Sequence, residues 1–436
     1  MKTLQQIEPR APISALPFTI TNPGSYYVTT TLAGTAGQNG ISIQADNVAL
    51  DLCGFVLQGV SNSVSGIVVG SQENVTIRNG TVRGWGANGV DAGAASDALI
   101  EGLIVSDNQA TGLLAGDNSR VSRCIARQNG GDGIYLGSGS SIRDCTATGN
   151  TASGIDTLND CTIESCTAGA NTFHGIYPDN NCTVHRCTCN GNRGSGINTF
   201  QGNLISLCIA NGNTNAGIVV GNGSSVQGCV ARANIGFGIS GTTECTFSDC
   251  TVSSGATNGI NAGNVCTVRG CSVGGNAGSG IVVFYGSTVV HCSAGGNTKD
   301  GINIGNGAEA IECTAVGNQY NGIEAAASST VSGCMARGNT FDGILSKGAC
   351  MILNNNCSYN SFNGIRAISS SDRIEGNHLD ANATYGLLIQ IQNANDIVIK
   401  NSAHDNLGSP YSIAPGNDVG PIGTAAGSTS PWANLQ

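Results

Sequence analysis

Short runs of alternating apolar and polar residues follow one another along most of the chain. In one stretch they read Gly-Ile-Tyr-Leu at 133–136, Ser-Ile-Arg at 141–143 and Cys-Thr-Ala at 145–147. Alternation of this kind is typical of a half-buried strand, and each run is too short for a helix. Gly, Asn, Ser and Asp residues separate the runs, as expected of turns. The pattern therefore predicts many short strands joined by tight turns.

These runs repeat with a fixed period. A Gly followed by Ile, Val or Leu recurs from Gly112 to Gly364, and every interval between them is 21 residues. Three strands and three turns in each period predict one coil of a parallel β-helix, with successive coils about 4.8 Å apart. We expect an all-β, right-handed parallel β-helix (solenoid) of about 17 coils, because crossovers between parallel strands are right-handed.

Cysteine and asparagine follow the same period, so each should form a ladder along the coils. One cysteine column runs from Cys124 to Cys334, and an asparagine column runs from Asn108 to Asn360 with Gly255 as its one interruption. Stacked asparagine amides hydrogen-bond to one another along such ladders. The cysteines alternate with outward residues, occur in no Cys-x-x-Cys motif and number 19, an odd total. We predict buried free thiols, with disulfides or a metal site as the alternatives.

The ends of the chain depart from the repeat. Residues 1–39 precede it and are predicted to cap the solenoid, which needs a segment that shields its terminal core. The β-helix is expected over residues 40–406. Residues 407–436 form a tail rich in Gly, Ser and Pro, which is either an ordered cap or a linker.

Charge and hydropathy exclude several classes of partner. The chain carries 18 basic and 28 acidic residues, a net charge of −10, and has no run of basic residues. A nucleic-acid-binding protein should show a basic patch or stripe, so we expect no nucleic-acid partner. No apolar stretch is long enough for a transmembrane helix, and no membrane insertion is expected. A polyanionic sugar would be repelled unless a cation such as calcium bridged it.

The repeat resembles a known family. Its characteristic places are occupied, in one coil, by Ile134, Leu136, Ile142, Cys145, Ala147 and Asn150. This unit resembles the repeat of right-handed parallel β-helix proteins of the pectin-lyase-like superfamily, of an uncharacterised bacterial secreted type, with cysteine in place of the usual first asparagine. The resemblance implies a polysaccharide partner and, if the protein is an enzyme, a polysaccharide lyase or glycoside hydrolase.

The resemblance also implies an extracellular or cell-surface location. The first residues, Met1 to Leu4, lack the apolar core of a signal peptide. The protein is therefore either intracellular or made with a secretion segment that this sequence lacks.

Position in the repeat selects one group of candidate site residues. The polygalacturonase-like Asp-Asp dipeptide is absent, and 173–175 (Phe-His-Gly) keeps half of the histidine motif. The residue after each Gly-Ile should face outward, and the residue before each Gly lies at a corner beside it. Carboxylates, a histidine and tyrosines on neighbouring coils suit acid–base attack on a sugar. We predict catalytic roles for Asp156, His174, Tyr177 and Asp179, and substrate binding by Asp132 and Tyr135.

A second group lies on later coils and holds Asp300, Glu324, Asp342, Lys347 and Arg366. Of these, Glu324 and Arg366 are further predicted substrate-binding residues. Both groups also fit the simpler interpretation of a solvated outer face. No cofactor is required by the sequence, and the identity of any metal is unknown. Ca²⁺ would join if the substrate were a uronate, with Asp156 and Asp179 as oxygen ligands.

Two function classes remain open at this point. One is a secreted protein that binds or acts on an extracellular polysaccharide along its lateral face. The other is a non-enzymatic structural or adhesive surface rod, self-associating as a homo-oligomer through its ends or lateral faces. An ice-binding face is a weaker third idea, because the threonine column of Thr146, Thr167 and Thr188 breaks at Ile209.

Overall fold

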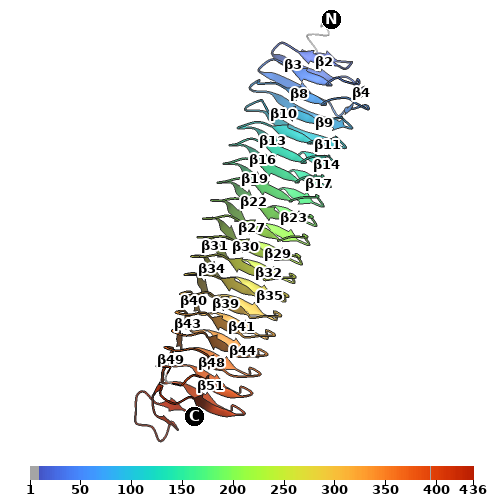
Figure 1. Ribbon diagram of the computed structural model, residues 1–436. Helices are drawn as coiled ribbons and strands as arrows, with labels where there is room; N and C mark the ends of the chain where they lie inside the picture. The colour runs from blue at the N-terminus through green and yellow to red at the C-terminus, as the bar shows by residue number, and fades with distance from the viewer. Residues whose placement is uncertain (1–8, 393) are drawn as a thin grey trace. The chain divides into compact units, whose positions relative to one another are not determined.

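Parallel strand pairing runs through both parts of the computed structural model (Figure 1), which describes residues 9–392 and 394–436. The strands form two compact units, residues 1–215 and 216–436. Within the described residues no helix occurs, and so none could cross a membrane. The fold is an all-β parallel β-solenoid with a 21-residue repeat. The predicted fold class is confirmed.

Each regular turn of unit 1 contributes a first, a second and a third strand. The first strands are β2 (Phe18–Ile20), β5 (Ile41–Ile43), β8 (Ile67–Val69), β10 (Val90–Ala92), β12 (Leu113–Ala115), β15 (Ile134–Leu136), β18 (Ile155–Thr157), β21 (Ile176–Pro178) and β24 (Ile197–Asn198). The second strands are β1 (Ala11–Ile13), β3 (Gly24–Val28), β6 (Val48–Asp51), β13 (Arg120–Ser122), β16 (Ser141–Arg143), β19 (Thr162–Glu164), β22 (Thr183–His185) and β25 (Leu204–Ser206). The third strands are β4 (Leu32–Ala33), β7 (Val56–Gln58), β14 (Ile125–Arg127), β17 (Thr146–Thr148), β20 (Thr167–Gly169), β23 (Thr188–Asn190) and β26 (Ile209–Asn211). The longer strands β9 (Thr76–Arg83) and β11 (Leu99–Ser106) serve as second and third strands at once.

Unit 2 repeats the same plan. Its first strands are β27 (Ile218–Val220), β30 (Ile239–Gly241), β33 (Ile260–Ala262), β36 (Ile281–Val283), β39 (Ile302–Ile304), β42 (Ile323–Ala325), β45 (Ile344–Ser346), β48 (Ile365–Ala367), β51 (Tyr385–Ile389) and β54 (Ser409–Ile413). Its second strands are β28 (Ser225–Gln227), β31 (Thr246–Ser248), β34 (Thr267–Arg269), β37 (Thr288–Val290), β40 (Glu309–Ile311), β43 (Thr330–Ser332), β46 (Met351–Leu353), β49 (Arg373–Glu375), β52 (Ile397–Ile399) and β55 (Asp418–Val419). Its third strands are β29 (Val230–Arg232), β32 (Thr251–Ser253), β35 (Ser272–Gly274), β38 (Ser293–Gly295), β41 (Thr314–Val316), β44 (Met335–Arg337), β47 (Asn356–Ser358), β50 (His378–Asp380) and β53 (Ser402–His404), followed by β56 (Ile422–Gly423) and β57 (Asn434–Leu435).

The end segments also form strands. In the N-terminal segment, β2 pairs with β5 and β3 pairs with β6, in parallel register. In the C-terminal segment, β54 pairs with β51, and β57 pairs with β53 and β56. The total is about 19 turns, against the expected 17, because each end segment adds strands that the glycine pattern does not mark.

Register in the solenoid is set by the repeat. Tyr135 on β15 lies opposite Asp156 on β18, and Asp156 lies opposite Tyr177 on β21. The flanking isoleucines, such as Ile134 and Ile155, are fully buried. A slip by one residue would exchange inner and outer faces and expose the isoleucine column, so burial fixes the register.

The asparagine ladder satisfies backbone groups at a corner. The amide of Asn150 donates to Asn171 Oδ1 at 3.1 Å and to the carbonyl of Ala126 at 3.2 Å. Its own Oδ1 accepts from the side-chain amide and the backbone N–H of Asn129, both at 3.0 Å. Each buried amide therefore joins three turns, which confirms the predicted ladder.

The cysteines form a similar ladder as thiols. All 19 are free, and all except Cys53 are buried. The backbone N–H of Cys124 donates to Cys145 Sγ at 3.3 Å, and that thiol donates to the carbonyl of Arg143 at 3.3 Å. Cys187 and Cys189 both face the core, as predicted. Cysteine thus fills a place that asparagine takes in later turns, where the N–H of Cys334 donates to Asn355 Oδ1 at 2.8 Å.

Candidate functional site

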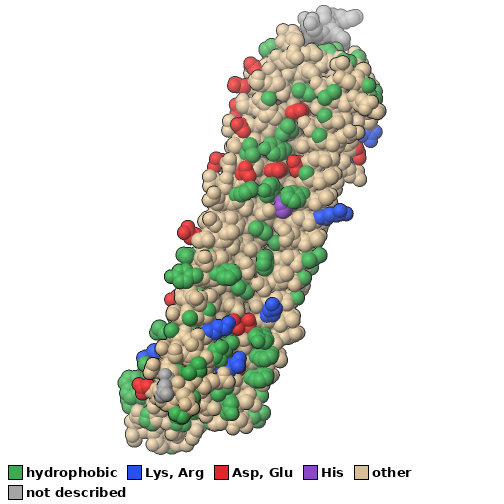
Figure 2. Space-filling view, in the orientation of Figure 1, with side chains coloured by type: hydrophobic (Ala, Val, Ile, Leu, Met, Phe, Trp, Pro, Cys, Tyr) green, Lys and Arg blue, Asp and Glu red, His purple; other side chains and the backbone are tan. Residues whose placement is uncertain are grey.

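The predicted first group lies on the outer face of the first strands of unit 1. We call it the acidic–aromatic site and define it as Asp132, Tyr135, Asp156, Phe173, His174, Tyr177, Asp179 and Phe200. Strands β15, β18 and β21 place Tyr135, Asp156 and Tyr177 in adjacent turns at one register position. The face of this unit seen in Figure 2 shows acidic and hydrophobic side chains gathered together.

Asp156 is the electrostatic centre of the site. Burial, together with the nearby charges of Asp132 and Asp179, raises its pKa to about 7. No basic side chain among the described residues forms an ion pair with any of these three carboxylates. Asp156 therefore exchanges a proton near neutral pH, which an exposed aspartate does not do.

Asp132 and His174 occupy equivalent corners and share a structural task. Asp132 Oδ1 accepts a hydrogen bond from the backbone N–H of Ser153 at 2.8 Å. His174 Nδ1 accepts from the backbone N–H of Ser195 at 3.0 Å. Burial raises the pKa of Asp132 and lowers the pKa of His174. Each side chain therefore fixes the next turn, and the imidazole is neutral at neutral pH.

The second ring nitrogen of His174 is also engaged. Since Nδ1 accepts, the neutral ring carries its proton on Nε2. The side-chain amide nitrogen of Asn198 lies 3.0 Å from Nε2. Two donors cannot pair, so the hydrogen bond forms with the Asn198 amide turned to present its oxygen. With both nitrogens occupied, the imidazole is held in a fixed orientation.

Aromatic rings surround this histidine. Tyr177 stacks on His174 with ring centroids 5.0 Å apart, and Phe173 lies 4.0 Å from the same ring. Phe200 lies 5.7 Å from Tyr177. The side chains of Phe173 and Phe200 are about half exposed, at 51% and 46%. The rings form an apolar platform beside the carboxylates, a surface on which sugar rings can stack.

The two tyrosine hydroxyls keep their protons. Burial and the charge of Asp156 raise the pKa of both Tyr135 and Tyr177. They are consequently hydrogen-bond donors throughout the neutral range. Asp179 follows β21, and its backbone N–H donates to the carbonyl of Thr157 at 2.9 Å.

The structure thus brings together all six residues of the first predicted group and adds two that the sequence analysis missed. Phe173 adjoins His174 in the sequence. Phe200 lies 21 residues after Asp179, so the same period could have placed it one turn further along. Exposed aromatics at a repeat corner were the available signal.

The second predicted group lies in unit 2 and is internally neutralised. Lys347 Nζ lies 2.5 Å from Glu324 Oε1, and Arg366 Nε lies 2.6 Å from Asp342 Oδ2. Burial and then the charge of Glu324 raise the pKa of Asp300 to about 6. Tyr320, Phe341 and Phe362 stack beside them, with centroids 4.4 and 5.1 Å apart. This surface also combines aromatic rings with carboxylates. Two of its carboxylates, those of Glu324 and Asp342, form ion pairs with basic residues.

Among residues 9–392 and 394–436, no cluster of three or more His, Cys, Asp or Glu side chains could hold a metal ion. Calcium ligation by Asp156 and Asp179 together with a uronate stays a prediction.

With this geometry in place, comparisons with known proteins identify the family. The profile described as Right handed beta helix region matches residues 65–204 and 174–298, together more than half of the chain. The chain belongs to the right-handed beta-helix family. Comparison with curated protein sequences gives no match.

Several solved structures show distant similarity to the chain. A GH87 alpha-1,3-glucanase catalytic domain in complex with tetrasaccharides is 12% identical, with a TM-score of 0.43 over 61% of this chain and 60% of that chain. A pectate lyase is 18% identical, with a TM-score of 0.33 over 57% and 68% of the two chains. A mannuronan C-5 epimerase module from Azotobacter vinelandii is 14% identical, with a TM-score of 0.27 over 95% and 90%. The chain thus spans less than two thirds of the length of the glucanase domain.

Proposed function

We propose that this β-helix protein is extracellular, binds a neutral or weakly acidic polysaccharide across the acidic–aromatic site and hydrolyses its glycosidic bonds. The observation that carries the proposal is Asp156, whose pKa is raised to about 7 beside half-exposed aromatic rings. A carboxylic acid that keeps its proton near neutral pH is what a glycosidase uses to protonate a leaving group.

The roles follow from the environment of each side chain. Asp156 donates its proton to the glycosidic oxygen. Asp179 is the second carboxylate that glycoside hydrolysis requires, and it acts on water or on the sugar itself. The Tyr177 hydroxyl stays protonated and donates a hydrogen bond to the sugar. Tyr135, Phe173 and Phe200 stack against the sugar rings. Asp132 accepts hydrogen bonds from the hydroxyl groups of the sugar.

His174 is assigned a positioning role. Its nitrogens are held by Ser195 and Asn198, and its ring face supports Tyr177. It therefore orients the tyrosine and is not the group that transfers a proton in this proposal.

Hydrolysis fits the charges of the site better than elimination from a uronate. Elimination builds negative charge next to a carboxylate, and that charge needs a cation or a basic side chain beside it. The acidic–aromatic site presents three carboxylates without an ion-pair partner among the described residues. These carboxylates would repel a polyuronate.

The second group is proposed as a binding surface of unit 2. Glu324 and Arg366 flank an exposed aromatic stack and can hydrogen-bond to sugar hydroxyls. Because Lys347 and Asp342 already pair with them, we assign this surface no proton transfer.

The test is a panel of neutral and weakly acidic polysaccharides, with new reducing ends as the readout. On a responsive substrate, Asp156→Asn should lower kcat at least 100-fold, the scale of general-acid catalysis. Activity of the unaltered protein should fall as the pH rises through about 7. Asp160→Asn, an exposed aspartate in the same turn, is the matched control and should change little. Full activity of Asp156→Asn would refute the assignment.

A non-enzymatic structural or adhesive protein is the second candidate. The corner bonds of Asp132 and His174 favour it, because Asn258 and Asp342 in unit 2 make equivalent bonds to the next turn at 3.0 and 3.2 Å. In that case Asp132→Ala and His174→Ala should lower the Tm, and no polysaccharide of the panel should be cleaved.

A further inference from the structure

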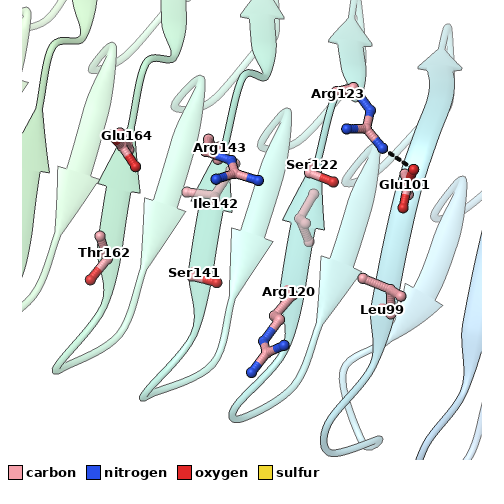
Figure 3. A pocket seen from close by; sticks show the side chains of 11 residues that line it. Leu99, Glu101, Arg120, Ser122, Arg123, Ser141, Ile142, Arg143, Thr162 and Glu164 are labelled. Carbon is pink, nitrogen blue, oxygen red and sulfur yellow. Dashed lines mark hydrogen bonds and ion pairs between the residues drawn. The ribbon is translucent and has the colours of Figure 1, made fainter.

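A groove of about 370 Å³ lies on the second strands of unit 1, in the sheet that does not carry the acidic–aromatic site (Figure 3). Strands β11, β13, β16 and β19 form its floor, and its lining includes Glu101, Arg120, Ser122, Arg123, Arg143 and Glu164. A neighbouring hollow of about 280 Å³ shares Leu99 and Arg120 with it. Arg120 thus stands where the two hollows meet. We call the larger one the arginine groove.

The arginines of this groove are unusual in an acidic chain. Three arginines and two glutamates line it, although the whole chain has a net charge of −10. Arg123 forms an ion pair with Glu101, which Figure 3 marks with a dashed line. Arg143 Nε lies 3.5 Å from Asp144 Oδ2, and both side chains are at least half exposed. No ion pair or hydrogen bond of the Arg120 side chain occurs within the described part of the chain. The guanidinium group of Arg120 is therefore available to a ligand, and the guanidinium group of Arg143 is held only by a long, exposed ion pair.

Hydroxyl groups lie between these arginines. The register places Ser141 opposite Arg120, and Arg143 opposite Ser122. Thr162 follows opposite Ser141 in the next turn. Adjacent turns lie about 4.8 Å apart, so guanidinium and hydroxyl donors alternate within a few ångströms of one another.

We propose that the arginine groove binds a single anionic group, a carboxylate or a sulfate or phosphate monoester, carried by a hydroxyl-rich sugar. A guanidinium presents a planar fork of N–H donors that matches the oxygens of such a group. Arg120 and Arg143 hold the anion, and Ser122 and Ser141 donate to it. Glu101 and Glu164 stand in the turns on either side, accept from sugar hydroxyls and repel further anionic groups. The groove thus selects an isolated charge over a polyanion.

Equilibrium binding of four small probes tests this proposal: D-glucose, D-glucuronate, and a sulfate and a phosphate monoester of glucose, at constant ionic strength. We expect at least one charged probe to bind more tightly than glucose. Arg120→Ala and Arg143→Ala should each weaken that binding about tenfold, the usual effect of losing one charge-assisted hydrogen bond. The relative affinities of the three anions show which chemistry the groove prefers.

Arg127→Ala is the matched control, because Arg127 is exposed on β14 of the same turn and lies outside the groove lining. It should leave binding unchanged. Equal loss in Arg127→Ala and Arg120→Ala would show a nonspecific charge effect and overturn the proposal. Equal affinity for glucose and all three anions would overturn it as well. This inference does not depend on the proposed hydrolysis, since Asp156→Asn should leave anion binding intact.

Discussion

A single proton on Asp156 links the electrostatics of the acidic–aromatic site to its proposed chemistry. The carboxyl is half-buried, and the charges of Asp132 and Asp179 oppose its ionisation. Above neutral pH the carboxyl group of Asp156 is ionised, and the ionised form at this place lowers the stability of the folded protein. The same residue is useful to a reaction that needs an acid, so cost and function have one physical origin.

The stability of the protein should therefore depend on pH through this residue. The folded-state pKa of Asp156, about 7, lies above its unfolded value of 3.8. Its contribution is fully present below about pH 4 and is lost as the pH rises toward 7. The pKa difference of about 3 units corresponds to about 4 kcal/mol, and solvent screening of this partly exposed side chain reduces that to about 2 kcal/mol. Asp156→Asn removes this loss and should raise the free energy of unfolding by that amount at alkaline pH relative to acidic pH. Urea unfolding at both pH values measures it, and an identical effect at the two would contradict the prediction.

The buried thiols also act as specific hydrogen-bonding residues. Cys145→Ala removes the acceptor for the backbone N–H of Cys124 and should cost about 1–3 kcal/mol. Cys145→Ser keeps an acceptor and should cost less, because Ser140 already accepts the N–H of Ser119 at 3.0 Å. Chemical denaturation of both variants decides between packing and hydrogen bonding. An equal loss in the two would assign the whole effect to packing.

At the scale of the element, each turn is joined to the next by side chains as well as by strand pairing. The asparagine ladder supplies these links at one corner, and the cysteines supply them at another. The asparagine ladder is interrupted wherever a residue of the column has no side-chain amide. Gly255, in unit 2, is the one position in its column between Asn108 and Asn360 that lacks an amide.

Restoring that amide should stabilise unit 2. The backbone N–H of Gly255 already donates to Asn276 Oδ1 at 3.0 Å. A Cβ at this position would lie 3.2 Å from Asn276 Oδ1 and 3.5 Å from the carbonyl of Asn234, which small shifts can accommodate. Gly255→Asn should therefore raise the free energy of unfolding by about 1 kcal/mol. Gly255→Ala is the control for backbone entropy alone, and the prediction fails if the two variants are equal.

The sequence predicts the elements well because their spacing is periodic and their alternation is strict. The period alone predicts one outer column for Tyr135, Asp156 and Tyr177, and the register places them there. The same logic misjudges Leu345, which shares that column position but is only 5% exposed. Its neighbours in the adjacent turns are Glu324 and Arg366. Long neighbouring side chains decide exposure there, and a column rule does not include them.

Other features of the site could not be read from spacing. The hydrogen bonds of Asp132 and His174 to the next turn depend on how a corner bends. The arginine groove was not predicted either, because Arg120 and Arg143 are 23 residues apart and fall in different columns. Diagonal neighbours across two turns become visible only once the register is known.

At the scale of the whole molecule, the distribution of cysteine gives a chemical signature of the fold. Burial raises the pKa of Cys350 and of Cys357, so these thiols are poor nucleophiles as well as inaccessible. Cys53 is the exposed exception, although burial and the charge of Asp51 raise its pKa too. A β-helix with this core should hide nearly all of its thiol chemistry while folded.

Alkylation with and without denaturant tests this property directly. In the native protein, mass spectrometry should find one label, on Cys53, because the other 18 cysteines are buried and the core excludes the reagent. In denaturant without reductant, all 19 cysteines should be labelled. A Cys53→Ala variant should then show no label when folded and 18 when unfolded, since only one of the 19 thiols is lost. Protection that persists in denaturant would mean disulfides, and it would contradict the thiol ladder on which the packing of both units rests.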